Sequence, residues 1–255
     1  MRSNWSLITA GFGSDVQVAA ADRVVRQASK LSALKIRGFK YFDLPKFAPE
    51  CWTNYQEFLN IENKGFGYFS WKPELVWKTF ESMPEQNSGV IWVDAGCEVN
   101  INIVSKRFLR RMMKKAERDG YFFYSLRYPE NAYTKKLLFA KFGENAINDS
   151  SPQVQATWFL LYGELGRNIA QKWFEISKLG IEYLDLSKSS SEHENFIEHR
   201  FDQSVLSLTA KSFGCKISKI RPPDGRSRLS RLRGYFYPIW SSRNRTGDSL
   251  IKIKV

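Results

Sequence analysis

The chain of 255 residues has little cysteine and histidine, three residues of the first and two of the second. Cys51, Cys97 and Cys215 lie far apart and form no CxxC pair, so the sequence predicts neither a disulfide framework nor a structural zinc site. Long apolar runs are also missing, whereas a membrane-spanning helix needs about 18 or more apolar residues in a row. The short apolar segment that ends at Gly11 lacks the cleavage-site pattern of a signal peptide. We therefore expect a cytoplasmic protein that contacts a membrane only peripherally, at the inner face of the plasma membrane.

Acidic residues are outnumbered, because 26 Asp and Glu stand against 39 Lys and Arg, which gives a formal net charge of +13. A surface with this charge attracts anions such as nucleic acid, anionic lipid headgroups or phosphorylated small molecules, and charge alone does not select among them. The sequence contains no zinc-finger or RNP-type aromatic motif. We therefore expect no nucleic-acid partner and keep a basic nucleic-acid-binding protein as the weaker alternative.

Apolar patterning predicts an α/β protein. Hydrophobic residues make up 43% of the chain, which is ample for a packed core, and the length suits one large domain. Strand-like apolar segments occupy residues 5–9, 35–42, 89–93, 121–126 and 153–162. Helix-like segments alternate with them at residues 16–34, 74–83, 104–118, 166–179 and 202–213. Residues 42–63, which include Pro45 and Pro49, are expected to be rich in loops.

Basic residues gather in two segments. In the amphipathic segment 104–118, Lys and Arg crowd one face, and the apolar face consists of Val104, Phe108, Leu109, Met112 and Met113. Residues 221–245 are rich in Arg, Ser, Gly and Pro, so we expect a loop or arm there. The predicted organisation is one domain over residues 1–220 and a basic C-terminal segment, 221–255, packed on it or extending from it. Four arginines of this segment are expected to hold the protein near anionic lipid: Arg226, Arg228, Arg231 and Arg233.

The most informative short segment is residues 91–98, in which a buried apolar strand ends at Asp94. The carboxyl edge of the sheet is where α/β proteins bind ligands, and a carboxylate there can bind a ribose hydroxyl or a cation that bridges a diphosphate. The small residues Ala95 and Gly96 let a ligand approach the backbone closely. A strand-ending turn capped by Asp94 is an equally good interpretation of the segment.

A second polar group surrounds the start of the helix expected from residue 202. It contains His199, Arg200, Asp202 and Gln203, and the N-terminal end of a helix favours negative charge. Asp202 as a helix cap and His199 as a structural residue are the alternatives to a functional role.

Three segments in order resemble a set of bacterial GT-A-type glycosyltransferases that are found with surface polysaccharide genes. They are GFGYFSWKP at residues 65–73, VDAGCE at 93–98 and EHRFDQS at 198–204. The Asp202-Gln203 pair followed by apolar residues is also distantly similar to family 8 glycosyltransferases. The likeness extends from about Leu7 to Arg245, nearly the whole chain. It implies a single GT-A-like, Rossmann-type domain with a mostly parallel central sheet flanked by helices, plus the basic C-terminal arm.

The resemblance implies transfer of a hexosyl or related sugar from a nucleotide-sugar donor to a glycan or glycolipid acceptor, in bacterial surface polysaccharide synthesis. The Asp94 segment then takes the place of the Asp-x-Asp motif, which binds the ribose and a Mn²⁺ or Mg²⁺ ion. Gly96 stands where the second Asp, the usual metal ligand, is expected. Three alternatives follow: Glu98 replaces that ligand, Asp94 binds the ion with His199, or Lys and Arg neutralise the diphosphate without a metal.

The expected site has a catalytic and a donor-binding part. Asp202 is the expected catalytic carboxylate, with His199 beside it. The expected donor-binding residues are Asp94, Gly96, Lys72, Gln155, Gln203, Arg243 and Arg245. Aromatic residues that would exclude water are Phe66, Tyr68, Phe69 and Trp71. Solvated surface charges are the alternative for Lys72 and the arginines, and a catalytically inactive scaffold subunit of the same fold is the alternative for the whole chain.

Overall fold

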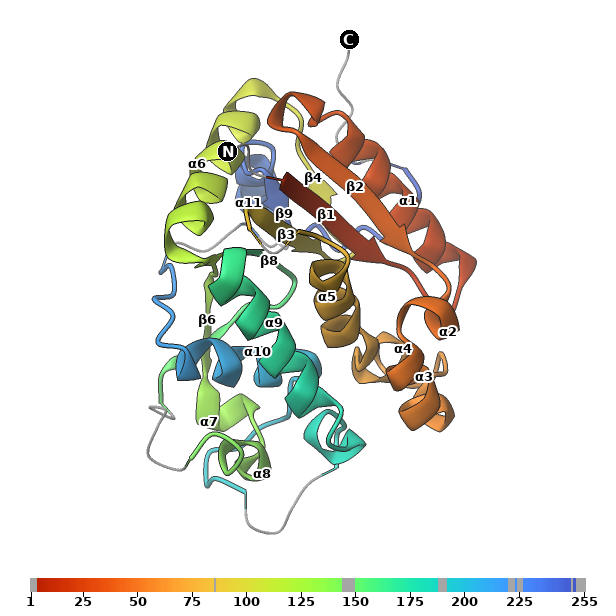
Figure 1. The fold of residues 1–255 in the computed structure, drawn as a ribbon, viewed down its shortest axis with the longest axis vertical. Coiled ribbons are helices and arrows are strands. Elements are labelled where there is room, and N and C mark those ends of the chain that lie inside the picture. Colours follow the sequence, from red (N-terminus) through yellow and green to blue (C-terminus); the bar gives the residue numbers. More distant parts are fainter. Residues whose placement is uncertain are drawn as a thin grey trace.

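A computed structural model describes residues 4–84, 86–143, 150–187, 192–219, 223, 227–248 and 250. These residues form a five-stranded central sheet in the order β2-β1-β3-β8-β5 (Figure 1). The strands are β1 (Asn4–Ala10), β2 (Ile36–Tyr41), β3 (Ser88–Val93), β5 (Tyr121–Phe122) and β8 (Trp158–Tyr162). The predicted α/β class is therefore confirmed.

The central sheet is mixed: β2, β1, β3 and β5 run in one direction, and β8 runs against them. Strand β1 pairs in parallel with β2 and β3, but β8 is antiparallel to both β3 and β5. The chain reaches β8 from the edge at which β3 ends, because the Asp94 N–H donates to the Thr157 carbonyl at 2.9 Å. The chain therefore runs back along β3, and this reversal brings residues 155–157 beside Asp94.

Helices cover both faces of the sheet. Helices α1 (Asp15–Ser29) and α6 (Ile103–Asp119) cover one face, over a core that includes Leu7, Ile91 and Leu160. Helices α5 (Trp71–Glu81) and α9 (Gly163–Ser177) cover the other, over Val90, Trp92 and Phe159. Neighbouring residues of β3 therefore enter opposite cores, as the period of two in a strand requires. Helix α10 (Phe201–Ser212) packs against α9 (Figure 1).

Shorter elements complete the described fold. The short helices are α2 (Leu44–Phe47), α3 (Pro49–Tyr55), α4 (Gly65–Tyr68), α7 (Glu130–Tyr133), α8 (Lys136–Phe139) and α11 (Arg228–Gly234), with 3-10 turns at Ser32–Leu34, Gln56–Phe58 and Ile181–Tyr183. Strand β4 (Glu98–Val99) pairs with β9 (Ile239–Trp240), and β6 (Ser125–Pro129) pairs with β7 (Pro152–Val154).

Residues 42–63 contain helices where a loop-rich stretch was predicted. Pro45 and Pro49 lie in the first turns of α2 and α3, where a missing N–H costs nothing. The buried carboxylate of Glu74 accepts the backbone N–H groups of Glu50 and Cys51 at 3.1 and 2.7 Å, and so satisfies the start of α3. The residue that caps α3 lies in another helix, so the sequence around Pro49 gives no sign of a helix start, and a loop was predicted instead.

The described part of the C-terminal segment packs on the domain, with α11 and β9 followed by residues 241–248 that have no regular structure. Tyr237, Ile239 and Trp240 are buried, and β9 pairs with β4. Arg226 and the side chains of Arg228 and Arg231 lie outside the described residues, so their expected role stays a prediction. Helix α6 buries Leu109, Met112 and Met113 as predicted, but Val104 is exposed. No helix in the described ranges is long and apolar enough to cross a membrane.

Candidate active site

A cleft of about 710 Å³ opens at the carboxyl edge of β1 and β3. Its walls come from six parts of the chain: residues 10–17, residues 61–72, residues 92–97, residues 156–157, residues 198–203, and residues 241–245. The loops that follow β1 and β3 meet there because both strands run in the same direction. The cleft is therefore the expected place for a ligand in this fold.

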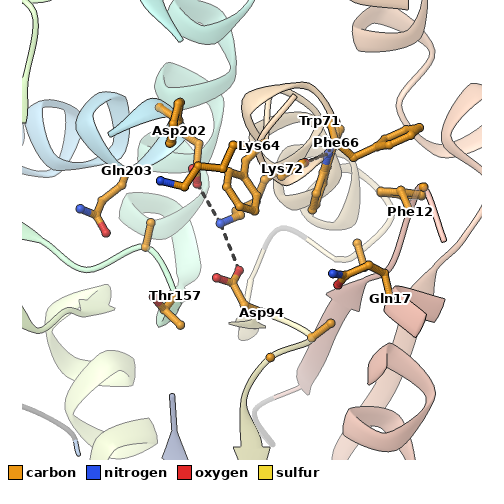
Figure 2. A pocket seen from close by; sticks show the side chains of 18 of the residues that line it. Phe12, Gln17, Lys64, Phe66, Trp71, Lys72, Asp94, Thr157, Asp202 and Gln203 are labelled. Atoms are coloured by element: carbon orange, nitrogen blue, oxygen red, sulfur yellow. Dashed lines mark hydrogen bonds and ion pairs between the residues drawn. The ribbon is translucent and has the colours of Figure 1, made fainter. Parts of the chain in front are cut away.

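Two carboxylates and one ammonium group meet inside the cleft. The Lys72 Nζ atom lies 3.1 Å from Asp94 Oδ1 and 2.8 Å from Asp202 Oδ2 (Figure 2). Asp94 follows β3, Lys72 lies in the first turn of α5, and Asp202 lies in the first turn of α10. We call these three residues the cleft cluster. All three were predicted as site residues, and the fold brings them together from positions 72, 94 and 202.

A tight turn before α5 directs Lys72 into the cleft. Phe66, Tyr68 and Phe69 adopt the left-handed backbone conformation, with φ of 55°, 58° and 60°. Such conformations cost of order 1 kcal/mol or more each in residues other than glycine, and they concentrate at functional sites. The Trp71 indole N–H holds the turn by donating to the carbonyls of Gly65 and Phe66, both at 3.1 Å.

Burial and charge set the protonation of the cluster. Burial disfavours the ammonium form of Lys72, but Asp202 and Asp94 outweigh it and raise the Lys72 pKa, so the side chain stays a cation. Burial raises the pKa of Asp202 to about 6, although Lys72 opposes the shift. At neutral pH Asp202 is therefore an ionised carboxylate close to its pKa, as a general base should be.

Asp94 is oriented by its neighbours and is open to the cleft. The Trp92 indole N–H donates to Asp94 Oδ1 at 2.7 Å, and 28% of the Asp94 side chain is exposed. The Cys97 N–H donates to the Asp94 carbonyl at 2.9 Å, which closes the turn after β3. Both interpretations of this segment are thus compatible, since Asp94 ends a strand in a turn and also faces a ligand cleft.

The C-terminal segment closes one side of the cleft. Arg243 and Arg245 line it with exposed side chains, as predicted. The Asn244 N–H donates to the Gly96 carbonyl at 3.1 Å, and a Cβ atom on Gly96 would lie 3.8 Å from the Arg243 Cα atom. The two backbone segments are therefore joined by a hydrogen bond beside the cleft, and a side chain at position 96 would make only an ordinary van der Waals contact with Arg243.

Sequence reasoning missed Arg23, the residue that fixes this segment. Its guanidinium group is buried and donates to the carbonyls of Ala95, Cys97 and Asn244 at 2.7, 2.9 and 3.1 Å. It also lies 3.4 Å from the buried carboxylate of Glu98. We call Arg23, Glu98 and Asn244 the strap cluster. One sequence feature could have indicated that Arg23 is buried: it directly precedes the apolar residues Val24 and Val25 of the predicted helix.

His199 and Glu98 do not line the cleft, and their predicted roles do not fit the structure. The His199 ring is 2% exposed; its Nδ1 atom accepts the Lys135 N–H at 3.3 Å, and Nε2 donates to the Tyr183 carbonyl at 2.9 Å. Burial, followed by the nearby charge of Lys135, lowers the His199 pKa to about 3. The side chain is thus neutral with both nitrogens engaged, which favours the structural alternative. Glu98 is sealed in the strap cluster.

The two predicted glutamines have different positions. Gln203 lines the cleft and donates to the buried side chain of Gln153 at 2.8 Å. Gln155 is buried outside the lining and donates to Ser241 Oγ at 3.3 Å, so it supports a residue of the cleft wall. Lys64 and Gln17 line the cleft without having been predicted as site residues (Figure 2).

Comparisons with known proteins give structural likeness alone. No protein-family model matches the chain, and no curated protein matches its sequence. The apo form of mouse xyloside xylosyltransferase 1 is similar with a TM-score of 0.46 and 13% identity, over 96% of this chain and 99% of that one. The apo WbbM bifunctional glycosyltransferase is similar with a TM-score of 0.42 and 8% identity, over 94% of this chain and 46% of that one.

Proposed function

We propose that the protein is a glycosyltransferase that moves a hexosyl or related sugar from a nucleotide-sugar donor to a hydroxyl of a glycan or glycolipid, in bacterial surface polysaccharide synthesis. One observation carries the proposal. Two carboxylates from the ends of different elements converge on a buried ammonium group, within a basic cleft at the ligand-binding edge of an α/β sheet.

The charge of the cleft suits a nucleoside diphosphate. Five basic residues line it, namely Lys64, Lys72, Arg200, Arg243 and Arg245. Three acidic residues line it, Asp94, Glu198 and Asp202, so the formal lining charge is +2. Glu198 pairs with Arg200 at 3.2 Å, which leaves the exposed Lys64, Arg243 and Arg245 for phosphate oxygens. Asp94 then has the position to bind the ribose hydroxyls.

Sugar transfer makes two demands on the protein. The bond from the anomeric carbon to the diphosphate breaks with its electron pair moving to the phosphate oxygen, and the acceptor oxygen bonds to that carbon and loses its proton. We assign the neutralisation of the leaving diphosphate to Arg243 and Arg245. We assign to Asp202, whose pKa is about 6, the removal of the proton from the acceptor hydroxyl. The rings of Phe66, Phe69 and Trp71 line the cleft and limit access of water.

The test combines binding with turnover. Titration calorimetry against UDP, GDP, CDP, ADP and their sugars should find one preferred nucleotide, and Asp94→Ala should weaken its affinity by about tenfold or more because a hydrogen-bonded charged contact is lost. Asp22→Ala is the matched control, because Asp22 forms a surface ion pair with Lys40. Unchanged affinity in Asp94→Ala would refute the donor site. A nucleotide bound but never consumed with any glycan acceptor would favour the inactive scaffold.

We also propose that the protein works at an anionic membrane surface. Exposed side chains of α6 share one face, with Ile103 in the first turn and Arg107, Arg110, Arg111 and Lys114 after it. The Asn102 side chain donates to the Tyr235 carbonyl at 2.6 Å, which brings the end of α11 to the start of α6. Exposed apolar residues continue there at Leu229 and Leu232 on α11, and at Phe236 just beyond its end. Apolar insertion beside basic residues is how interfacial helices bind lipid.

Flotation with liposomes separates this proposal from nucleic-acid binding. Vesicles with phosphatidylglycerol should carry the protein, pure phosphatidylcholine vesicles should not, and Leu229→Ser with Phe236→Ser should abolish flotation while leaving nucleotide affinity intact. Binding that depends on charge alone would survive these two changes and would fall steeply with salt for arbitrary oligonucleotides as well. That result would favour the nucleic-acid alternative.

A further inference from the structure

We infer that donor binding in this cleft needs no divalent cation, because the Lys72 ammonium group occupies the place between Asp94 and Asp202 that such a cation would take. The inference rests on the proposed function. It answers the question that the sequence left open at Gly96, where the resemblance implies a metal ligand and the chain has none.

The position of Lys72 is the first step of the argument. Its side chain is 2% exposed, and its Nζ atom lies 3.1 and 2.8 Å from the two carboxylates. The rings of Phe69 and Trp92 enclose the same ammonium, with centroids at 4.8 and 5.4 Å. A Mg²⁺ or Mn²⁺ ion bound to both carboxylates would need oxygen contacts of about 2.1 Å. The metal ion would therefore have to displace the Lys72 ammonium group from its contacts with the two carboxylates and the two aromatic rings.

The other residues that were predicted as metal ligands form contacts within the protein. Glu98 accepts the Asn244 side-chain N–H at 2.7 Å and faces Arg23, outside the cleft. Both ring nitrogens of His199 have backbone partners. Oδ1 of Asp94 already receives Lys72 and the Trp92 indole. Across the described ranges, no group of three or more His, Cys, Asp and Glu residues converges to hold a metal ion. The donor set therefore does not fit the ion that the resemblance implies.

The cleft carries its own replacement for the charge of a metal. The Lys72 ammonium group supplies a permanent positive charge in the cleft wall, where the two carboxylates and the two aromatic rings hold it. Arg243 and Arg245 line the cleft on the segment that the strap cluster fixes, and guanidinium groups bind phosphate oxygens in pairs. Cations in this position can stabilise the negative charge that develops on a leaving diphosphate.

Titration calorimetry on the wild-type chain tests the inference without any variant. UDP, GDP, CDP and ADP are titrated once in EDTA and once with Mn²⁺ or Mg²⁺ in excess. We expect the preferred nucleotide to bind with a Kd that agrees within about twofold between the buffers. Affinity that is tenfold or more higher with the metal overturns the inference and leaves the proposed function standing. Absence of binding in both buffers overturns the proposed function, and the inference with it.

A substitution at Lys72 adds a measurement that a purely structural lysine would not affect. Lys72→Gln leaves the two carboxylates facing each other without a cation, so Mn²⁺ alone should raise its Tm and partly restore its nucleotide affinity. Mn²⁺ should leave the Tm of the wild type and of the surface control Lys40→Gln unchanged. An equal rise in all three proteins would overturn the inference. Lys72→Arg, which keeps the charge, should remain insensitive to the metal.

Discussion

Two clusters of buried charge lie beside the same turn after β3, and they differ in their exposure to solvent. The strap cluster is sealed: Arg23 is 1%, Glu98 0% and Asn244 7% exposed. Its guanidinium group is surrounded by carbonyls and a carboxylate of the chain. The cleft cluster has two carboxylates for its one ammonium group, and it is open on one side, where 28% of the Asp94 side chain is exposed. The sealed cluster is complete within the protein, whereas the open one still offers contacts to a ligand.

This difference explains why residue type alone does not identify the site. Asp94 and Glu98 are carboxylates four positions apart after the same strand, and the sequence offered both as metal ligands. Glu98 lies on β4 and faces Arg23, while Asp94 precedes β4 and faces the cleft. An ionised pair that is fully enclosed holds segments together, and its loss is expected to affect stability first. Substitutions in the open cleft cluster are expected to reduce turnover before they reduce stability.

Asp202→Asn should cause the largest functional loss. The amide keeps the size of the side chain but cannot accept the acceptor proton, so transfer should fall by about 10²- to 10⁴-fold. The Kd of the preferred nucleotide should change by less than about threefold, because the change is confined to the reacting centre. Release of nucleoside diphosphate in the presence of acceptor measures the first quantity, and calorimetry measures the second.

The pH profile of the wild type provides the control for this variant. Burial raises the pKa of Asp202 to about 6, so the carboxylate is protonated as the pH falls through that value. Transfer that depends on the ionised form should therefore decrease below about pH 6 and level off above it. Wild-type turnover in Asp202→Asn, or a flat profile between about pH 5 and 8, would contradict the assignment.

Most elements of the fold were predictable because their patterns are local. The apolar run of β3 and the amphipathic pattern of α6 appear within single segments, and both are observed. The reversal of β8 was not predictable, because strand direction depends on how residues 155–157 approach Asp94. The prolines of α2 and α3 suggested loops, since the cap for α3 comes from Glu74 in another helix.

The residues that meet in the cleft were predictable where they lie in motifs whose order resembles that of a known family. Lys72, Asp94 and Asp202 each adjoin an element end, and the resemblance grouped them. His199 was placed wrongly because its distance from Asp202 in the sequence says nothing about direction. It precedes α10 and turns toward Lys135 and Tyr183. Arg23 was missed because its partners, Ala95, Cys97 and Asn244, are distant in the chain.

Arg23→Met should be the most destabilising change in the strap cluster. It removes one member of a buried charge pair and leaves Glu98 without its cation, which typically costs about 3–5 kcal/mol. Urea unfolding measures this loss. Asp22→Asn, the neighbouring position on α1, breaks only the surface pair with Lys40 at 2.7 Å and should cost less than about 1 kcal/mol. Equal effects of the two substitutions would show that the strap cluster is not a structural centre.

The smallest expected effect is an acid dependence of stability that comes from His199. Burial lowers its pKa from 6.5 to about 3 in the folded protein, so the unfolded chain binds an extra proton between these values. The contribution of His199 to stability is therefore complete above about pH 6.5 and is lost as the pH falls, by about 2 kcal/mol at about pH 5.

Urea unfolding at about pH 7 and pH 5 measures the loss, and His199→Gln should lose about 2 kcal/mol less than the wild type between the two conditions. His193→Gln is the control for removing a histidine as such, since His193 packs its ring against Phe139 at 5.2 Å. If the wild type and His199→Gln lose the same stability, the His199 ring is protonated in the folded protein. Its Nδ1 atom could then no longer accept the Lys135 N–H, and the assignment of His199 as a neutral structural residue outside the cleft would fail.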